Sequence, residues 1–136
     1  MIKAIHIFVL YALFFTVCTP FHLLKAQRPQ GRFLTDSMEI GKPFQYALSF
    51  RHSPKTEVFF PDTSADFRPF QVVKLAYFPT QTNESGSLDS AVYTLVSFEL
   101  NKTQTLEVPV WILTNRDCTA VFSEKDAIHL KELIKG

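Results

Sequence analysis

Apolar and polar residues alternate along much of the chain after residue 27, with the period of two that a β-strand requires. The clearest alternation runs from residue 44 to residue 51 and places four large apolar side chains on one face: Phe44, Tyr46, Leu48 and Phe50. Burying all four stabilises the fold by roughly 6 to 12 kcal/mol. Fixing eight backbones costs roughly 8 to 16 kcal/mol. This strand therefore needs a second apolar layer facing it.

Six further segments have strand patterns and are separated by turn residues. They are residues 38–40, 57–60, 71–78, 90–100, 105–113 and 119–122. Pro79 is expected to end the strand at 71–78, and the polar residues 80–88 are expected to form a mobile loop. In the strand at 90–100 the predicted inward residues are Val92, Val96, Phe98 and Leu100.

The segment 105–113 is predicted as one strand whose even-numbered apolar residues face inward: Leu106, Val108, Val110 and Ile112. Pro109 interrupts it on the opposite face. A proline removes a hydrogen-bond donor from the sheet, so we expect an edge strand or a bulge here. The tail from Ser123 to Gly136 fits two structures. It is either a strand or loosely held segment, which we favour, or a helix that begins at a capping box-like Ser123.

Six or seven short strands at intervals of about ten residues predict an all-β fold. The expected architecture is an antiparallel β-sandwich of the immunoglobulin-like or fibronectin type III-like kind over residues 27–136. Residues 127–136 are also considered as a linker to a missing C-terminal part. The Cys…Trp…Cys order of true immunoglobulin domains is absent, because Trp111 precedes Cys118 and no third landmark fits.

Residues 1–26 have the pattern of a secretory signal peptide. Lys3 gives a positive start, and Ile7 to Val17 form an apolar run that is too short to span a bilayer. Ala26 is a small residue at the expected cleavage point, so the mature chain is predicted to begin at Gln27. Two alternatives are weighed: an uncleaved leader that anchors the protein, and lipidation of Cys18, against which Val17 counts.

Composition and charge narrow the range of partners. Without the leader, the chain has 12 basic and 13 acidic residues, since Lys3 and Lys25 are removed from 14 and no acid is lost. No basic stripe is present, so we expect no nucleic-acid partner. The mature chain keeps one cysteine, Cys118, which excludes an intramolecular disulfide. Burial near a strand start is the expected role of Cys118, and a reactive thiol or an intermolecular bridge is the alternative.

Candidate catalytic and metal-binding residues are sparse. His52 and His129 lie far apart without zinc-type spacing, and His52 is expected to bond a turn. Asp62 and Asp66 lack the spacing of a calcium loop and are expected to stabilise turns. We therefore predict no catalytic residue, no metal and no cofactor. Trp111 lies on the outward face of its strand and is the one candidate for surface contact.

The run from Gly41 to Phe50 resembles the opening of periplasmic immunoglobulin-like modules, in which a Gly-x-x-Phe turn enters an alternating strand. The BatD-type oxygen-tolerance proteins of Bacteroidota carry such modules. Residues 51–62 and 89–93 are similar to uncharacterised exported proteins of that group. The resemblance implies a periplasmic module, usually followed by a membrane helix. Membrane attachment would then use an uncleaved leader or a missing C-terminal helix.

The leading hypothesis is a non-enzymatic exported module for contact with a protein partner in the periplasm or cell envelope. It is based on the leader, the sandwich pattern and the sparse chemistry. The alternative is binding of a carbohydrate or surface polymer through Trp111, since exposed aromatic side chains can stack on sugar rings. A small hydrolase is the least favoured hypothesis.

Overall fold

The computed structural model describes residues 28–115 and 117–132, and the predicted leader and its cleavage point lie outside these ranges. Within them all regular structure is β-strand. The strands are β1 (Gln30–Phe33), β2 (Ser37–Met38), β3 (Phe44–His52), β4 (Glu57–Phe59), β5 (Phe70–Asn83), β6 (Gly86–Ser97), β7 (Thr103–Leu106), β8 (Pro109–Thr114), β9 (Asp117–Phe122) and β10 (Asp126–Leu130). The described part of the chain contains no helix able to cross a membrane.

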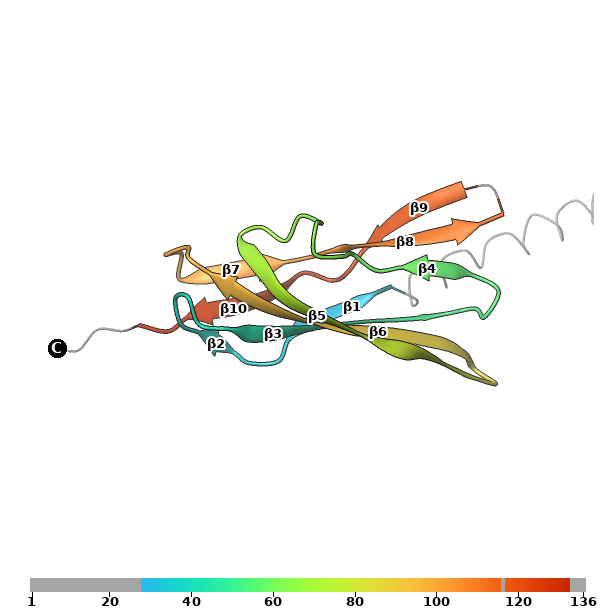
Figure 1. Cartoon of the computed structure of the whole chain (residues 1–136), viewed down its shortest axis with the longest axis horizontal. Helices are drawn as coiled ribbons and strands as arrows, with labels where there is room; N and C mark the ends of the chain where they lie inside the picture. Colours follow the sequence, from blue (N-terminus) through green and yellow to red (C-terminus); the bar gives the residue numbers. More distant parts are fainter. Residues whose placement is uncertain (1–27, 116, 133–136) are drawn as a thin grey trace, which may run out of the picture.

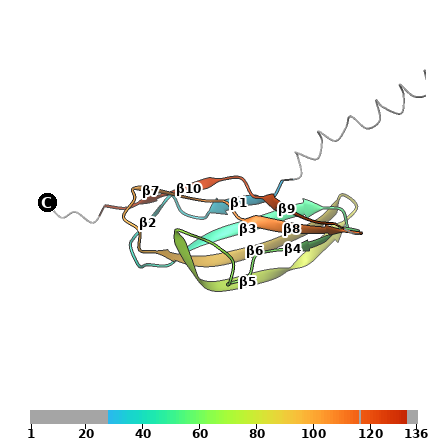
Figure 2. The ribbon, with the colours of Figure 1, turned by 90° about the horizontal axis from the view of Figure 1, so that it is seen from above.

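The strands form three sheets, with the orders β1-β3-β6-β5, β2-β10-β7 and β4-β8-β9 (Figures 1 and 2). All pairs are antiparallel except β10 with β2. One hydrophobic core includes residues of β3 and β6 together with residues of β8 and β10. The all-β prediction with antiparallel sheets is confirmed, and the arrangement is consistent with a β-sandwich.

Strand β3 lies where the alternation predicted it. Tyr46 and Leu48 are fully buried, and Phe44 and Phe50 are nearly so. Phe33 of β1 contacts three rings at centroid distances between 5.1 and 5.9 Å: Phe44, Tyr46 and Phe70. Tilted and edge-on ring pairs of this kind add to the stabilisation that burial gives. This aromatic cluster holds β1 and β3 against the start of β5.

A buried polar contact joins β3 to the segment between β9 and β10. The Tyr46 hydroxyl lies 3.2 Å from Ser123 Oγ, which also accepts the Val108 N–H at 3.0 Å. Gly31 faces this contact, and a Cβ added there would lie 1.6 Å from Tyr46 Oη. A glycine is therefore required at position 31 so that the tyrosine can cross the core.

The predicted single strand at 105–113 is wrong, because it is divided into β7 and β8, which belong to different sheets. The break falls at Glu107 and Val108, before Pro109. Ser123 bridges the break, because its N–H donates to Val108 O at 2.9 Å. Pro109 is the first residue of β8, a position where a missing donor is tolerated, and β8 is a central strand rather than an edge. The four predicted inward residues do face inward.

The prediction that Pro79 ends a strand is also wrong. β5 continues to Asn83 and forms a long hairpin with β6, so residues 80–88 are not an open loop. The register shifts between Phe78 and Gln81, which places Pro79 in an irregularity on an edge strand. Gly86 closes the hairpin with a φ of 128°, and a Cβ there would lie 2.8 Å from His52 O.

The predicted inward face of β6 needs correction. The fully buried residues are Ala91, Tyr93 and Leu95, whereas Phe98 and Leu100 lie beyond the end of β6 and are 60% and 78% exposed. Pairing with β3 decides this face, because Tyr93 lies opposite Tyr46 and therefore shares its side of the sheet.

The tail forms β10, which pairs with β7 and β2, so the favoured strand prediction is confirmed and the helix alternative is wrong. Ile128 is fully buried. Asp126 Oδ2 accepts the Phe33 N–H at 2.8 Å and ties the tail to β1. Residues 127–130 are thus part of the domain rather than a linker, and residues 133–136 lie outside the described range.

Candidate functional site

The sheet of β4, β8 and β9 presents an outward surface that is almost wholly apolar. Residues that pair directly across antiparallel strands share a face, so the registers define this surface. We call it the β8 face; its members are Glu57, Phe59, Pro109, Trp111, Leu113, Cys118, Ala120 and Phe122. Glu57 is its only charged member.

The β8 face is open to solvent. Phe59 is 53% exposed, Phe122 49% and Leu113 37%. Trp111 lies at its centre, half-buried, with Phe59 and Ala120 as its two cross-strand partners. The opposite face of the same sheet packs on the core through Val58, Val110 and Ile112, so the strands are apolar on both sides. Large contiguous apolar surfaces of this kind mark contact sites.

The structure places Trp111 on the outward face, as the alternation predicted. The expected burial of Cys118 is wrong, because Cys118 is exposed and its thiol is free. It belongs to the β8 face, opposite Leu113 in the β8–β9 hairpin. The hairpin projects from one end of the molecule (Figure 1), which explains why a residue at a strand start is not covered.

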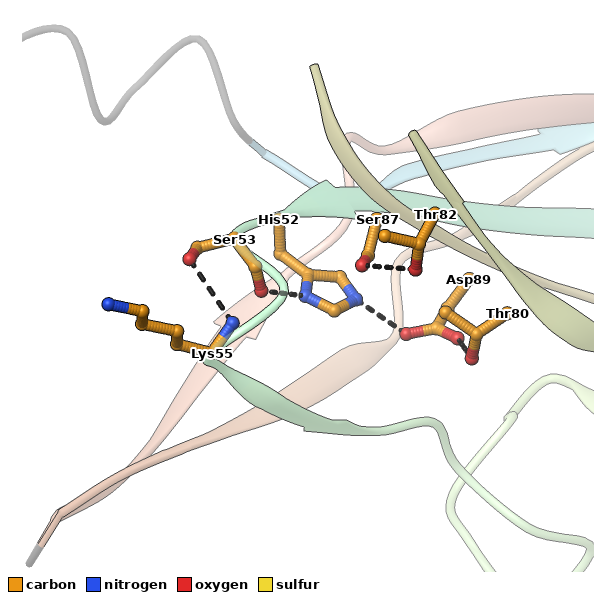
Figure 3. Close-up of polar contacts among 7 residues, drawn as sticks. All are labelled: His52, Ser53, Lys55, Thr80, Thr82, Ser87 and Asp89. Carbon is orange, nitrogen blue, oxygen red and sulfur yellow. Dashed lines mark hydrogen bonds and ion pairs between the residues drawn. The ribbon is translucent and has the colours of Figure 1, made fainter. Parts of the chain in front are cut away.

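A second cluster joins the end of β3 to the β5–β6 hairpin (Figure 3). His52 is 8% exposed, and its Nε2 lies 2.6 Å from Asp89 Oδ2, while its Nδ1 lies 2.8 Å from Ser53 O. The Thr80 hydroxyl donates to the other oxygen of Asp89. Beside them, the hydroxyls of Thr82 and Ser87 bond at 2.8 Å.

The hydrogen bonds of His52 limit its chemistry. Both ring nitrogens lie within hydrogen-bond distance of a protein oxygen, one a main-chain carbonyl and the other a carboxylate. Neither nitrogen is therefore free to bond to a bound molecule. The predicted bond from His52 to a turn is present, and its bond to Asp89 adds a tie between β3 and β6. The arrangement is suited to fixing the β3–β4 turn.

Between β4 and the β5–β6 hairpin lies a shallow cleft of about 330 Å³. Four aromatic side chains line it: Phe59, Phe60, Tyr77 and Phe78. Polar groups are close by, since Thr80, Asp89 and Ser90 line it too. A neighbouring depression of about 370 Å³ shares Phe59, Thr80 and Asp89 and reaches His52. Trp111 lines neither of these clefts.

The carboxylates of the β4–β5 connection stabilise turns, as predicted. Asp62 Oδ1 accepts from the N–H and hydroxyl of Ser64, which lowers the pKa of Asp62. Asp66 accepts from the guanidinium and the N–H of Arg68, and these bonds lower its pKa to about 2. The described residues contain no group of three or more His, Cys, Asp or Glu side chains placed to hold a metal.

Two buried tyrosines serve the core. Burial raises the pKa of Tyr46 to about 12, against the lowering effect of its bond with Ser123. Burial also raises the pKa of Tyr93, whose hydroxyl donates to Pro61 O at 2.6 Å. Tyr93 thereby fixes the chain just after β4, where the aromatic cleft begins.

Comparisons with models of protein families, with curated proteins and with solved structures give no match.

Sequence reasoning found Trp111 but missed its surroundings. Glu57, Phe59, Cys118 and Phe122 come from strands that the pattern did not place beside residue 111. The signal that was available is that both parities of residues 108–113 are apolar, whereas a strand with one solvated face alternates. The contact between His52 and Asp89 spans two strands and has no signal in the local sequence.

Proposed function

We propose that this protein is an exported, non-enzymatic module of the cell envelope that binds another protein through the β8 face. The observation that carries the proposal is the uncovered apolar surface around Trp111. Interface cores are enriched in aromatic residues and depleted of charge, and the β8 face has three aromatic members and one acid. The β8 face lies on a three-stranded sheet whose opposite side packs on the core, which favours a preformed contact surface.

We further infer an immunoglobulin-like sandwich. The order β1-β3-β6-β5 corresponds to strands A, B, E and D of such domains, and β4-β8-β9 corresponds to C, F and G. β7 and β10 then continue F and G past the breaks at Val108 and Ser123.

The apolar run at residues 7–17, with Lys3 before it and Ala26 after it, supports export to the periplasm or cell envelope. The expected resemblance of residues 51–62 and 89–93 to exported proteins of Bacteroidota points to the same location. The hydrogen bonding of His52 supports a non-enzymatic role, because the one His–Asp pair of the described residues has both ring nitrogens engaged.

A capture experiment with matched variants tests the proposal. The tagged protein is incubated with envelope extract, and retained proteins are identified for wild type, Leu113→Asp and Leu100→Asp. Leu100 is an exposed leucine outside the β8 face. We expect a specific partner retained by wild type and by Leu100→Asp but lost with Leu113→Asp. Equal retention by all three, or none by wild type, would contradict the proposal.

Binding of a carbohydrate or surface polymer is the second candidate, and the aromatic cleft between β4 and β5 favours it. That cleft combines rings that can stack on sugars with the polar groups of Thr80, Asp89 and Ser90. The β8 face around Trp111 offers only Glu57 for hydrogen bonding. A glycan array with wild type, Tyr77→Ala and Trp111→Ala separates the two surfaces, and a blank array would dismiss this candidate.

A further inference from the structure

Most exposed strand edges in this fold have features that hinder pairing with a strand of another molecule. β5 carries Lys74, Pro79 and two register shifts along its length. β4 is three residues long and lies between Pro54 and Pro61. Short strands, lysines, prolines and bulges all hinder the addition of another strand.

The remaining edges are also short or covered. β2 has two residues and β7 has four. β1 has four, and its last N–H is taken by Asp126. Edge strand β9 is longer than β1, β2, β4 and β7, with six residues, and after Asp117 it contains no charge, no proline and no register shift.

Two hydrogen bonds indicate which N–H and C=O groups of β9 lie on its free edge. The Ser123 N–H donates to Val108 O and so points toward β8. Successive residues of a strand point their N–H and C=O groups to alternate sides, so those of Phe122, Ala120 and Cys118 point away from β8. The Arg28 guanidinium, which donates to Phe122 O at 3.0 Å from outside the sheet, agrees with this assignment.

We propose that β9 pairs with β9 of a second copy of this chain, antiparallel and about a two-fold axis. The outward groups of Cys118 and Ala120 would bond to those of Ala120 and Cys118 in the second copy. Thr119 would then lie on the axis, opposite Thr119 of the second copy. The Arg28 contact with Phe122 O lies outside these bonds between residues 118 and 120.

Charge and shape favour a second copy as the occupant. Asp117 would lie opposite Val121 of the second copy, next to the Phe122 carbonyl that holds Arg28. Among the described residues, Asp117 of each copy is thus brought toward Arg28 of the other, while the two Asp117 side chains stay at opposite ends. The pairing would also join two β8 faces into one surface across a six-stranded sheet. It goes beyond the proposed function, since a dimer can form whether or not an envelope partner binds.

Disulfide trapping tests this register directly. A non-hydrogen-bonded antiparallel pair has its Cα atoms about 4.5 Å apart, within the range for a disulfide. In the full chain with Cys18→Ser and Cys118→Ser, we expect Thr119→Cys to give a cross-linked dimer under mild oxidation. Thr105→Cys, an exposed threonine of edge strand β7, is the matched control. Equal cross-linking at positions 119 and 105 would overturn the proposal.

Ala120→Pro gives an independent test. It removes an N–H that the monomer does not use, on a strand edge where proline is tolerated. Sedimentation over a wide concentration range should show a monomer–dimer equilibrium for wild type and a monomer for Ala120→Pro, with the same circular dichroism spectrum. A dimer that persists in Ala120→Pro contradicts the proposal. Failure of the wild type to capture any partner, with its dimerisation intact, would instead count against the proposed function alone.

Discussion

Strands β3 and β8 are both central strands of their sheets, but the side chains on their outer faces differ. β3 buries large apolar residues on one face and presents Gln45, Ser49 and Arg51 on the other. β8 buries Val110 on one face and presents Trp111 and Leu113 on the other. The side chains on the outer face of β3 can be solvated, so β3 needs no further cover. β8 has apolar side chains on its outer face that stay half-buried or exposed in the folded chain.

The comparison indicates that the residues that stabilise the fold and the residues proposed to bind a partner lie on opposite faces of the sheets. The inner faces decide stability, because removing buried apolar surface is costly. Residues of the β8 face contribute less to stability than those of the inner faces, because they are only partly buried. Substitutions on the two kinds of face should therefore separate stability from binding.

Leu48→Ala on the inner face of β3 should have the largest effect. Leu48 is fully buried in the core, so we expect a loss of about 2–5 kcal/mol in the free energy of unfolding. Urea titration followed by circular dichroism measures it. A loss below about 1 kcal/mol would mean that the core is not packed around β3.

Alkaline pH should weaken the inner face through Tyr46. Its folded pKa of about 12 lies above the ordinary value of 10.0, so its contribution is complete below pH 10 and is lost as pH rises toward 12. Two pKa units correspond to about 3 kcal/mol. Tyr46→Phe should reduce the slope of the stability profile between pH 10 and 12, and the buried Tyr93 should keep the rest. An unchanged slope in the variant would contradict the assignment.

The His52–Asp89 tie should contribute an intermediate amount. His52→Ala removes two hydrogen bonds at a nearly buried site, and we expect a loss of about 1–3 kcal/mol by thermal or urea unfolding. His129→Ala is the control, because His129 is exposed and bonds only weakly to Thr103 at 3.3 Å. Equal losses for the two histidines would contradict the prediction that the contacts of His52 contribute more to stability than those of His129.

Leu113→Asp on the β8 face should have the smallest effect on stability. Its side chain is 37% exposed, and an aspartate there would lie opposite Glu57, so we expect a loss of about 0.5–1 kcal/mol in the free energy of unfolding. Urea titration should show a midpoint only slightly below that of wild type. A large loss would show that the outer face of β8 belongs to the core.

Local pattern predicted β3 well because its alternation is strict and one-sided. It failed where both parities are apolar, as in β6, whose buried face is decided by pairing with Tyr46 and Leu48 of β3. It also failed at Pro79, because an irregularity on an edge strand accommodates a proline that would stop a central one. The expectation of an edge strand or a bulge at Pro109 was also wrong, because Pro109 is the first residue of the central strand β8.

The candidate site was predicted only at Trp111. The β8 face depends on which strands lie beside β8, and that follows from long-range pairing rather than from neighbouring residues. Cys118 illustrates the limit: its sequence position suits a buried strand start, but the β8–β9 hairpin extends beyond the core and leaves its thiol exposed.

The most direct test uses Trp111, the only tryptophan in the chain. Fluorine-labelled tryptophan places one reporter at the centre of the β8 face, and its resonance can be followed while unlabelled envelope extract is added. We expect the resonance to shift and broaden in wild type and in Leu100→Asp, but not in Leu113→Asp. An unchanged resonance in wild type, with the protein folded, would contradict the claim that this face is built for contact.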